Sequence, residues 1–307
     1  MKIIASAIAV LALCWSQGAQ AGPPPQRLPS AVIVYPLIVV EGNGAITDTR
    51  IEVVNLSNRV VHLGCIYVPA ETCSGFDFHV LLTPNQPISW LASRGIFSGA
   101  TAVPPFGSNG ELKCIVEPNE EEVAAHNTIQ GRAAVFGADG QTIGYSAVGF
   151  LRLTDGPLTN EIDLDGVTYT QCPDEQHFVF IASDPSTPAA ESELVLAPCT
   201  EDLENLVTRR TVVQFIVTNE LEVRFSASIS VFCSLRVRLD HIDTSDPTKS
   251  IFSRAVLGSD TGHLVVRGAE LPVLAMVVDR FLTPPAPATA GNEPALRGGR
   301  SAQIRIP

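Results

Sequence analysis

Cysteines are the residues of this chain whose type and spacing point most directly to chemistry. There are seven, and we expect Cys14 to be removed with an N-terminal segment. Of the six that remain, three precede residue 155 and three follow it: Cys65, Cys73, Cys114, Cys172, Cys199 and Cys233. An even number favours disulfide bonds outside the cytoplasm, and full pairing requires at least one bond between the halves, because each half holds an odd number. In the first half we favour a bond from Cys65 to Cys73 or to Cys114. In the second half we favour Cys172–Cys199.

The N-terminal residues have the pattern of a secretory signal peptide. Lys2 is followed by an apolar run from Ile3 to Cys14, and Ala19-Gln20-Ala21 forms a small-x-small cleavage signal. The run is too short to remain in a bilayer as a spanning helix. We therefore expect residues 1–21 to be removed on export. The mature chain is then secreted or periplasmic, with no transmembrane segment.

One tripeptide resembles a catalytic motif. Asp260-Thr261-Gly262 is similar to the Asp-Thr-Gly of aspartic proteases, in which two such loops bring two carboxylates together. The corresponding segment of the first half is Ser108-Asn109-Gly110, which has no carboxylate. His263 also follows the glycine, where that family favours Ser or Thr. We interpret the tripeptide as a turn and predict no catalytic residue.

Acidic and imidazole side chains occur close together in two places. Asp77 and His79 share one face of an expected strand, and Asp240-His241-Ile242-Asp243 holds a second group. Neither group has the paired ligand spacing of a known metal site. The sequence therefore predicts no metal site and no cofactor.

Two features are candidates for ligand binding. The first is a set of acidic residues with the oxygen ligands that Ca²⁺ prefers: Glu117, Glu120, Glu121 and Glu122. The second is Trp90, because an exposed indole on a β-sheet surface can stack on a sugar ring. Trp90 stands beside Ile88 and Leu91, so the alternative is that its ring belongs to the core.

Composition limits the class of protein. The chain has 32 acidic and 20 basic residues, a net charge of −12, so phosphate-rich partners such as nucleic acids are disfavoured. Hydrophobic residues make up 45%, which argues against general disorder. Sustained helical periodicity is rare, and short apolar segments alternate with turn residues. This pattern is typical of an all-β protein.

Similar segments recur in the same order in both halves. Val34-Tyr35-Pro36 precedes a strand that ends at Asn55, and Leu196-Ala197-Pro198 precedes a strand that ends at Asn219. The spacing from proline to asparagine is 19 residues in the first copy and 21 in the second. Further matches follow downstream, so we infer a tandem duplication.

The repeat predicts two tandem β-sandwich domains, Ig-like or jelly-roll-like, after the cleaved signal peptide. Domain 1 covers residues 30–154, a connector covers 155–192, and domain 2 covers 193–307. The spacing from Gly110 to Val148 is 38 residues, whereas the matching spacing from Gly262 to Val277 is 15. Domain 1 therefore carries a 23-residue insertion. Asp139-Gly140 predicts a tight hairpin turn in this region.

These observations favour an exported, non-catalytic β-sandwich protein with a binding or structural role at the cell envelope or outside the cell. The expected partner is a protein or polysaccharide at the cell surface. One alternative is a carbohydrate-binding module that uses Trp90 or the insertion. A second is a hydrolase or metal-dependent enzyme of unrecognised type with a dispersed site. The sequence identifies neither the ligand nor the oligomeric state.

Overall fold

The computed structural model describes residues 28–98, 101–117, 127–137, 140–154, 161–184, 190–205, 207, 209–281, 288–292 and 294–306. The expected signal peptide lies outside these ranges. Within them the chain forms strands joined by turns, with one short helix, α1 (Arg254–Leu257), and three 3₁₀ turns: η1 (Gly42–Gly44), η2 (Leu239–His241) and η3 (Pro247–Lys249). No helix of the described chain is long and apolar enough to cross a membrane.

Strands of the first 150 residues form two antiparallel sheets and a small hairpin. Sheet 1 has the order β11 (Val148–Phe150), β1 (Val32–Ile38), β8 (Gly110–Glu117), β3 (Val61–Pro69), β4 (Phe76–Leu82). Sheet 2 has the order β10 (Thr142–Ser146), β9 (Ile129–Phe136), β2 (Asp48–Asn55), β5 (Pro87–Leu91). The hairpin pairs β6 (Ile96–Ser98) with β7 (Thr101–Val103).

The rest of the described chain forms three more sheets. Sheet 3 has the order β12 (Glu161–Leu164), β23 (Ala302–Arg305), β15 (Glu201–Asp202), and its β15–β23 pair is parallel. Sheet 4 has the order β18 (Leu235–Arg238), β14 (Ala190–Pro198), β20 (Val273–Phe281), β21 (Ala288–Asn292). Sheet 5 has the order β17 (Arg224–Val231), β16 (Thr211–Asn219), β19 (Thr261–Gly268), β13 (Glu175–Ile181), β22 (Ala295–Arg297).

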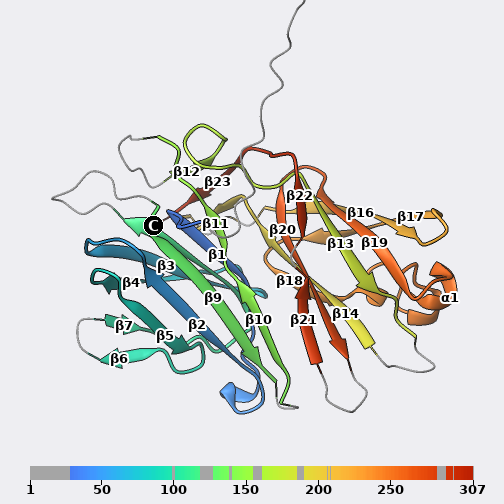
Figure 1. Cartoon of the computed structure of the whole chain (residues 1–307), viewed down its shortest axis with the longest axis horizontal. Coiled ribbons are helices and arrows are strands. Elements are labelled where there is room, and N and C mark those ends of the chain that lie inside the picture. Colours follow the sequence, from blue (N-terminus) through green and yellow to red (C-terminus); the bar gives the residue numbers. More distant parts are fainter. Residues whose placement is uncertain are drawn as a thin grey trace, which may run out of the picture.

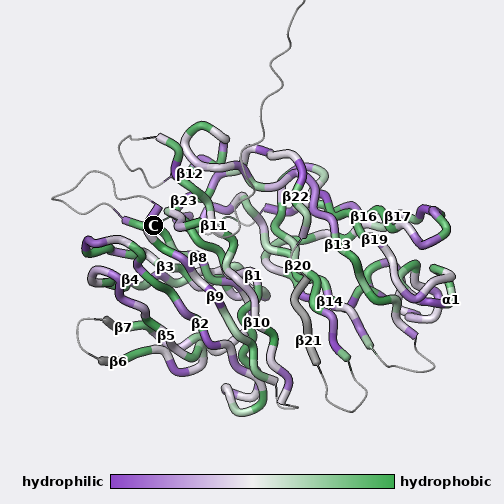
Figure 2. The backbone as a smooth tube through the Cα atoms, in the orientation of Figure 1, coloured by the Kyte–Doolittle hydropathy of each residue, from purple (hydrophilic) through white to green (hydrophobic). Residues whose placement is uncertain are grey.

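Alternating side chains bury one face of most strands. On β2, Ile51 and Val53 point into a core shared by sheets 1 and 2, whereas Arg50 and Glu52 point outward. A second core lies between sheets 4 and 5. All seven residues of β1 are buried, because this strand is covered on both faces. Figure 2 shows hydrophobic residues along β1, β8 and β20, and hydrophilic residues at the turn between β16 and β17.

The chain is all-β, as composition predicted, but the expectation of two tandem β-sandwiches is wrong. Sheets 1 to 5 are arranged as a five-bladed β-propeller. Sheet 3 draws its strands from residues 161–164, 201–202 and 302–305 (Figure 1). One hydrophobic cluster joins it to sheets 1 and 4. Packing therefore continues from one half of the chain to the other. Period-two alternation shows which face of a strand is buried but not which sheet covers it, so the sequence could not choose between the two architectures.

Local turn chemistry follows the sequence closely. β9 and β10 pair antiparallel as the predicted hairpin, and Gly140 has a φ of 78°, which glycine tolerates without steric cost. Asp139 lies outside the described residues, as do residues 118–126 in the region of the predicted insertion. Residues 155–192, predicted as a connector, contain β12, β13 and the start of β14. The domain boundaries themselves stay a prediction.

Two asparagines that align in the inferred repeat have matching roles. Asn55 ends β2, and its side chain donates to the carbonyl oxygens of Arg59 and Thr83 while it accepts from the backbone N–H of Ser57. Asn219 ends β16, and its side chain donates to the carbonyl of Leu257 and accepts from the N–H of the residue two positions on. Each asparagine therefore fixes the turn that follows its strand.

Candidate functional site

All six predicted cysteines are paired. The bonds are Cys65–Cys114, Cys172–Cys199 and Cys73–Cys233. The last of these spans 160 residues and joins the two halves, as the odd number of cysteines in each half required. Three disulfides indicate an oxidising, extracytoplasmic environment. The bonds leave no described cysteine available as a nucleophile.

Trp90, the candidate for sugar stacking, lies in the core. Its residue is 4% exposed, and its indole Nε1 donates to the hydroxyl of Tyr67 at 2.7 Å. The ring of Phe78 meets it edge-on, with ring centroids 6.4 Å apart. The indole faces therefore contact protein rather than solvent, which agrees with the alternative of a core tryptophan.

The acidic candidates are only partly described. Glu117 ends β8, and its Oε2 lies 3.1 Å from Nδ1 of His79 on the neighbouring part of sheet 1. Glu120, Glu121 and Glu122 lie outside the described residues. Within the described ranges, no group of three or more His, Cys, Asp or Glu side chains has the arrangement needed to hold a metal ion.

The other acidic groups are engaged in local structure. Asp240 is bonded by Arg238, and Asp243 accepts from the Ser250 hydroxyl at 2.6 Å, so both brace the turns around η2 and η3. Asp260 of the protease-like tripeptide is 69% exposed and pairs with Arg254 at 2.7 Å. Asp260 lies in a bend, but Thr261 and Gly262 begin β19, so the predicted turn covers only the first residue of the tripeptide.

A groove on the outer face of sheet 2 is a candidate binding site. Its volume is about 450 Å³, within the range of about 300–1,000 Å³ typical of small-ligand sites. Outward-facing residues of all four strands of the sheet line it. Its polar lining includes Arg50, Glu52, Ser89, Gln130, Arg132 and Ser146. The groove exists because the outward positions of these strands carry polar side chains above the buried face.

Two arginines that line this groove share a single carboxylate, that of Glu52. Nε of Arg132 lies 2.5 Å from Oε2 of Glu52, and Nε of Arg50 lies 3.3 Å from Oε1 of the same residue. A second guanidinium nitrogen of Arg50 donates to Ser89 at 3.2 Å. The side chains of Arg50 and Arg132 are 50% and 73% exposed. The groove therefore has one excess positive charge, with guanidinium donors facing solvent, on a chain whose net charge is −12.

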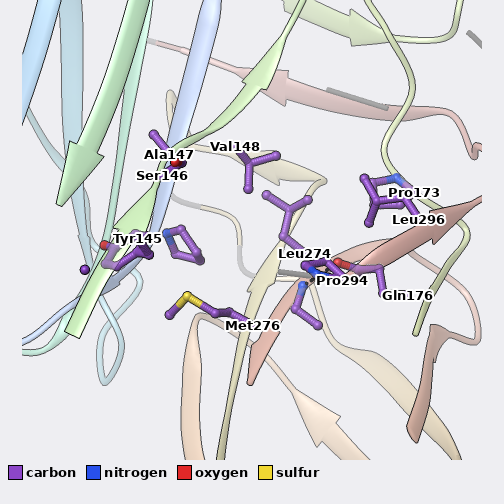
Figure 3. Close-up of a pocket in the computed structure, with 13 residues that line it drawn as sticks. Tyr145, Ser146, Ala147, Val148, Pro173, Gln176, Leu274, Met276, Pro294 and Leu296 are labelled. Carbon is purple, nitrogen blue, oxygen red and sulfur yellow. Dashed lines mark hydrogen bonds between the residues drawn. The ribbon is translucent and has the colours of Figure 1, made fainter. Parts of the chain in front are cut away.

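A second hollow lies between the two halves and is apolar (Figure 3). Tyr145 and Val148 of the first half face Leu274 and Met276 of β20 across it. The cavity volume is about 70 Å³, room for about two water molecules. The Gln176 amide at its edge donates to the Val273 carbonyl and accepts from the Ala275 N–H, each at 2.8 Å. The Gln176 amide thus holds β13 against β20. We interpret the cavity as a small packing defect between the two halves.

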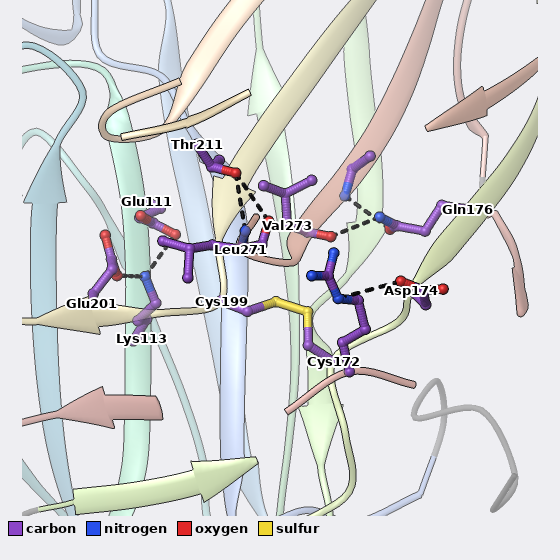
Figure 4. Close-up of a disulfide and its surroundings, with 12 residues drawn as sticks. Glu111, Lys113, Cys172, Asp174, Gln176, Cys199, Glu201, Thr211, Leu271 and Val273 are labelled. Carbon is purple, nitrogen blue, oxygen red and sulfur yellow. Dashed lines mark hydrogen bonds and ion pairs between the residues drawn. A yellow bond between two sulfur atoms is a disulfide. The ribbon is translucent and has the colours of Figure 1, made fainter. Parts of the chain in front are cut away.

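A third cluster is a buried group of charges between sheets 1 and 3. Glu111 and Lys113 are two residues apart on β8, so their side chains extend from the same face of the strand. Glu201 of β15, in sheet 3, meets them at this face (Figure 4). Nζ of Lys113 lies 2.9 Å from Oε2 of Glu111 and contacts Oε2 of Glu201. The side chains of Glu111 and Lys113 are at most 1% exposed, and that of Glu201 is 9% exposed.

Apolar strands enclose this cluster. Lys113 lies in register between Val34 of β1 and Ile66 of β3, both in the hydrophobic cluster that joins sheets 1, 3 and 4. Neither oxygen of Glu111 accepts a well-aligned hydrogen bond from a described residue. Burial raises the pKa of Glu111 to about 8, and the charge of Glu201 adds to this while Lys113 opposes it. At neutral pH burial therefore favours the neutral carboxyl form of Glu111.

Sequence reasoning missed both the groove and the buried cluster. Glu111 and Lys113 do interrupt an otherwise apolar strand, Gly110–Glu117, and that interruption was the available signal. Arg50 and Glu52 alternate with buried Ile51 and Val53, a pattern that any solvated strand face also shows. Neither signal identifies a partner on a distant strand.

Comparison with known proteins does not assign a family. No family model matches the chain, and no curated protein matches it. Among solved structures, the chain is similar to the apo form of a Pleurotus ostreatus lectin, with 11% identity over 92% of this chain and 80% of that chain. The TM-score of this match is 0.16, which is too low to support an argument about fold or function.

Proposed function

We propose that the protein is an exported, non-catalytic all-β protein that binds an acidic ligand outside the cytoplasm, in the periplasm or beyond the cell. The observation that carries this proposal is the groove on sheet 2, where Arg50 and Arg132 flank Glu52. The three disulfides support the compartment.

The proposed ligand is a chain of acidic sugars. A guanidinium presents a planar fork of donors that matches a carboxylate or sulfate group, and both arginines have donors directed to solvent. Ser89, Gln130 and Ser146 add short hydrogen-bonding side chains beside the charges, and these suit the hydroxyl groups of a sugar. Trp90 plays no part in this proposal.

Binding to immobilised polygalacturonate tests the proposal, with neutral dextran as the control polymer. We expect the full chain to bind polygalacturonate, and we expect binding to weaken as salt rises, because exposed charges are screened. Arg132→Ala and Arg50→Ala should each reduce affinity about tenfold, the loss of one charge-assisted hydrogen bond. Arg224→Ala, which removes an exposed arginine on β17, is the matched control and should leave affinity unchanged.

Three results would count against the groove as the site. These are equal retention on neutral dextran, an undiminished affinity in both groove variants, and an equal loss in the Arg224 control. If the chain instead binds a protein from the cell surface but no acidic polymer, the ligand class is wrong.

A further inference from the structure

The cluster of Glu111, Lys113 and Glu201 is costly as a purely structural feature. Removing charges from water costs several kcal/mol per ion, and a buried ion pair is often no more stabilising than apolar residues of the same size. Here a third ionisable group is buried beside the pair, and its oxygens lack well-aligned donors. A plain ion pair between the sheets would not need Glu111.

We propose that Lys113 and Glu201 form a covalent modification site, at which their side chains condense to an amide bond with Glu111 as the proton-transfer group. The juxtaposition has the three parts that this reaction needs: an amine, a carboxyl group in contact with it, and a second carboxyl group within 2.9 Å of the reacting nitrogen.

The reaction balances without any other reactant. The ammonium of Lys113 first passes a proton to the Glu201 carboxylate, which it contacts. The nitrogen lone pair then attacks Cδ of Glu201, so that a C–N bond forms. Glu111 donates its proton to one oxygen of Glu201 and takes a proton from the nitrogen. The C–O bond to that oxygen breaks, and one water molecule leaves.

Burial favours the product. In water, ammonium and carboxylate ions are stabilised by hydration, and this opposes condensation. In the apolar seam between sheets 1 and 3 that hydration is lost, whereas an amide carries no net charge. Burial lowers the pKa of Lys113, but the neighbouring Glu111 and Glu201 outweigh this and raise it, so proton transfer to Glu201 has to precede attack. Glu111 is available as a donor because its own pKa is raised to about 8.

The bond would add a second covalent link between the halves. Cys73–Cys233 already joins them, but a reductant can break it. The amide would join β8 to β15 and would survive reduction. This inference rests on the buried cluster alone and does not depend on ligand binding in the groove.

The intact mass of the purified chain, reduced and alkylated in denaturant, tests the inference. We expect a mass lower by one water than that of the same chain with six alkylated cysteines. Trypsin should fail to cleave after Lys113, so that residues 95–132 remain linked to residues 153–209 after reduction. A wild-type mass without the loss of water, with cleavage after Lys113, would overturn the proposal.

Lys249 is an internal control. Its Nζ lies 2.9 Å from Oδ2 of Asp246, the same separation as between Lys113 and Glu111, but its side chain is 76% exposed. We expect this pair to stay an ion pair, so an amine-reactive reagent should label Lys249 and not Lys113 in the denatured chain. Lys249→Arg should retain the loss of water. Labelling of Lys113 to the same extent as Lys249 would contradict the amide.

Glu111→Gln tests the proton-transfer role. We expect its mass to return to the full value and Lys113 to become reactive, with the fold checked by Trp90 fluorescence. If the variant still loses one water, Glu111 is not the proton-transfer group. Because the variant may not fold, Glu201→Ala, which removes the acylating group, provides a second chain that must keep its full mass and a reactive Lys113.

Discussion

Trp90 Nε1 donates a hydrogen bond to the Tyr67 hydroxyl at 2.7 Å, deep between sheets 1 and 2. Tyr67 lies on β3 and Trp90 on β5, so this bond connects one sheet to the other through the core. The Tyr67 ring also stacks on Phe106, with centroids 4.4 Å apart. Trp90, a candidate for ligand binding from the sequence, therefore connects sheets 1 and 2 within the core.

Tyr67→Phe should lower the free energy of unfolding by about 1–3 kcal/mol, because the buried indole N–H loses its acceptor. Urea unfolding followed by circular dichroism measures this. Tyr169→Phe is the matched control, since Tyr169 is also buried but its hydroxyl makes no hydrogen bond to a described residue. In the double variant Tyr67→Phe/Trp90→Phe, the loss of stability should be smaller than the sum of the losses in the two single variants, because neither the donor nor the acceptor remains buried without its partner. Equal effects of the two tyrosine substitutions would contradict the assigned role of the bond.

Replacing Cys73 and Cys233 together by serine should destabilise the chain more than replacing Cys172 and Cys199. The first bond closes a loop of 160 residues and the second a loop of 27. In the chain-entropy model these loops correspond to about 5 and about 4 kcal/mol, respectively. Urea unfolding under non-reducing conditions compares the two variants. The opposite order would show that native-state effects outweigh loop closure.

Asp279→Asn should become more stable relative to wild type as pH rises from about 4 to about 7. Burial raises the pKa of Asp279, although its bond from Ser192 opposes the shift. The folded state therefore keeps a proton that the unfolded chain has already released, and wild-type stability falls as pH rises through the folded pKa. The urea midpoint at several pH values measures the difference.

Asp165→Asn is a control of opposite sign. The pKa of Asp165 is lowered, since hydrogen bonds from the turn that it accepts outweigh the effect of burial. The folded state releases this proton at a lower pH than the unfolded chain does. Asp165 therefore stabilises the fold above the unfolded pKa and loses that effect in acid. Asp165→Asn should therefore lose stability relative to wild type as pH rises from about 2 to about 4, the range that ends at the unfolded pKa, and should change little above it. A shared direction for the two variants would argue against the assigned shifts.

Amide formation at Lys113 should slow when Glu111 is ionised. Because its pKa is raised to about 8, Glu111 is protonated below that pH and charged above it. Chain recovered unfolded from inclusion bodies at its full mass, before any amide has formed, should therefore lose water faster when it is refolded at about pH 6 than at about pH 9.5, where the proton donor is absent. The intact mass at successive times measures the rate. A faster reaction at the higher pH would indicate that deprotonation of Lys113, not protonation of Glu111, limits the step.

Some of these features followed from sequence alone because they depend on counting or on neighbouring residues. The bond between the halves follows from three cysteines on each side of residue 155, whatever the fold. The β9–β10 hairpin follows from the turn at Gly140. The turn predicted for Asp260-Thr261-Gly262 is present only at Asp260, because Thr261 and Gly262 begin β19. Trp90 was ambiguous, because a lone aromatic among aliphatic residues has no pattern that separates core from surface.

Other features required the tertiary structure because they join residues far apart in the chain. Arg132 meets Glu52 through the pairing of β9 with β2, and Lys113 meets Glu201 through the packing of sheet 1 on sheet 3. The all-β class, the need for a disulfide between the halves and the buried faces of most strands were determined by residue types and their period. The five-bladed arrangement and both candidate sites were decided by which sheet covers which face. Alternation along a strand specifies that a face is buried, but only packing specifies its partner.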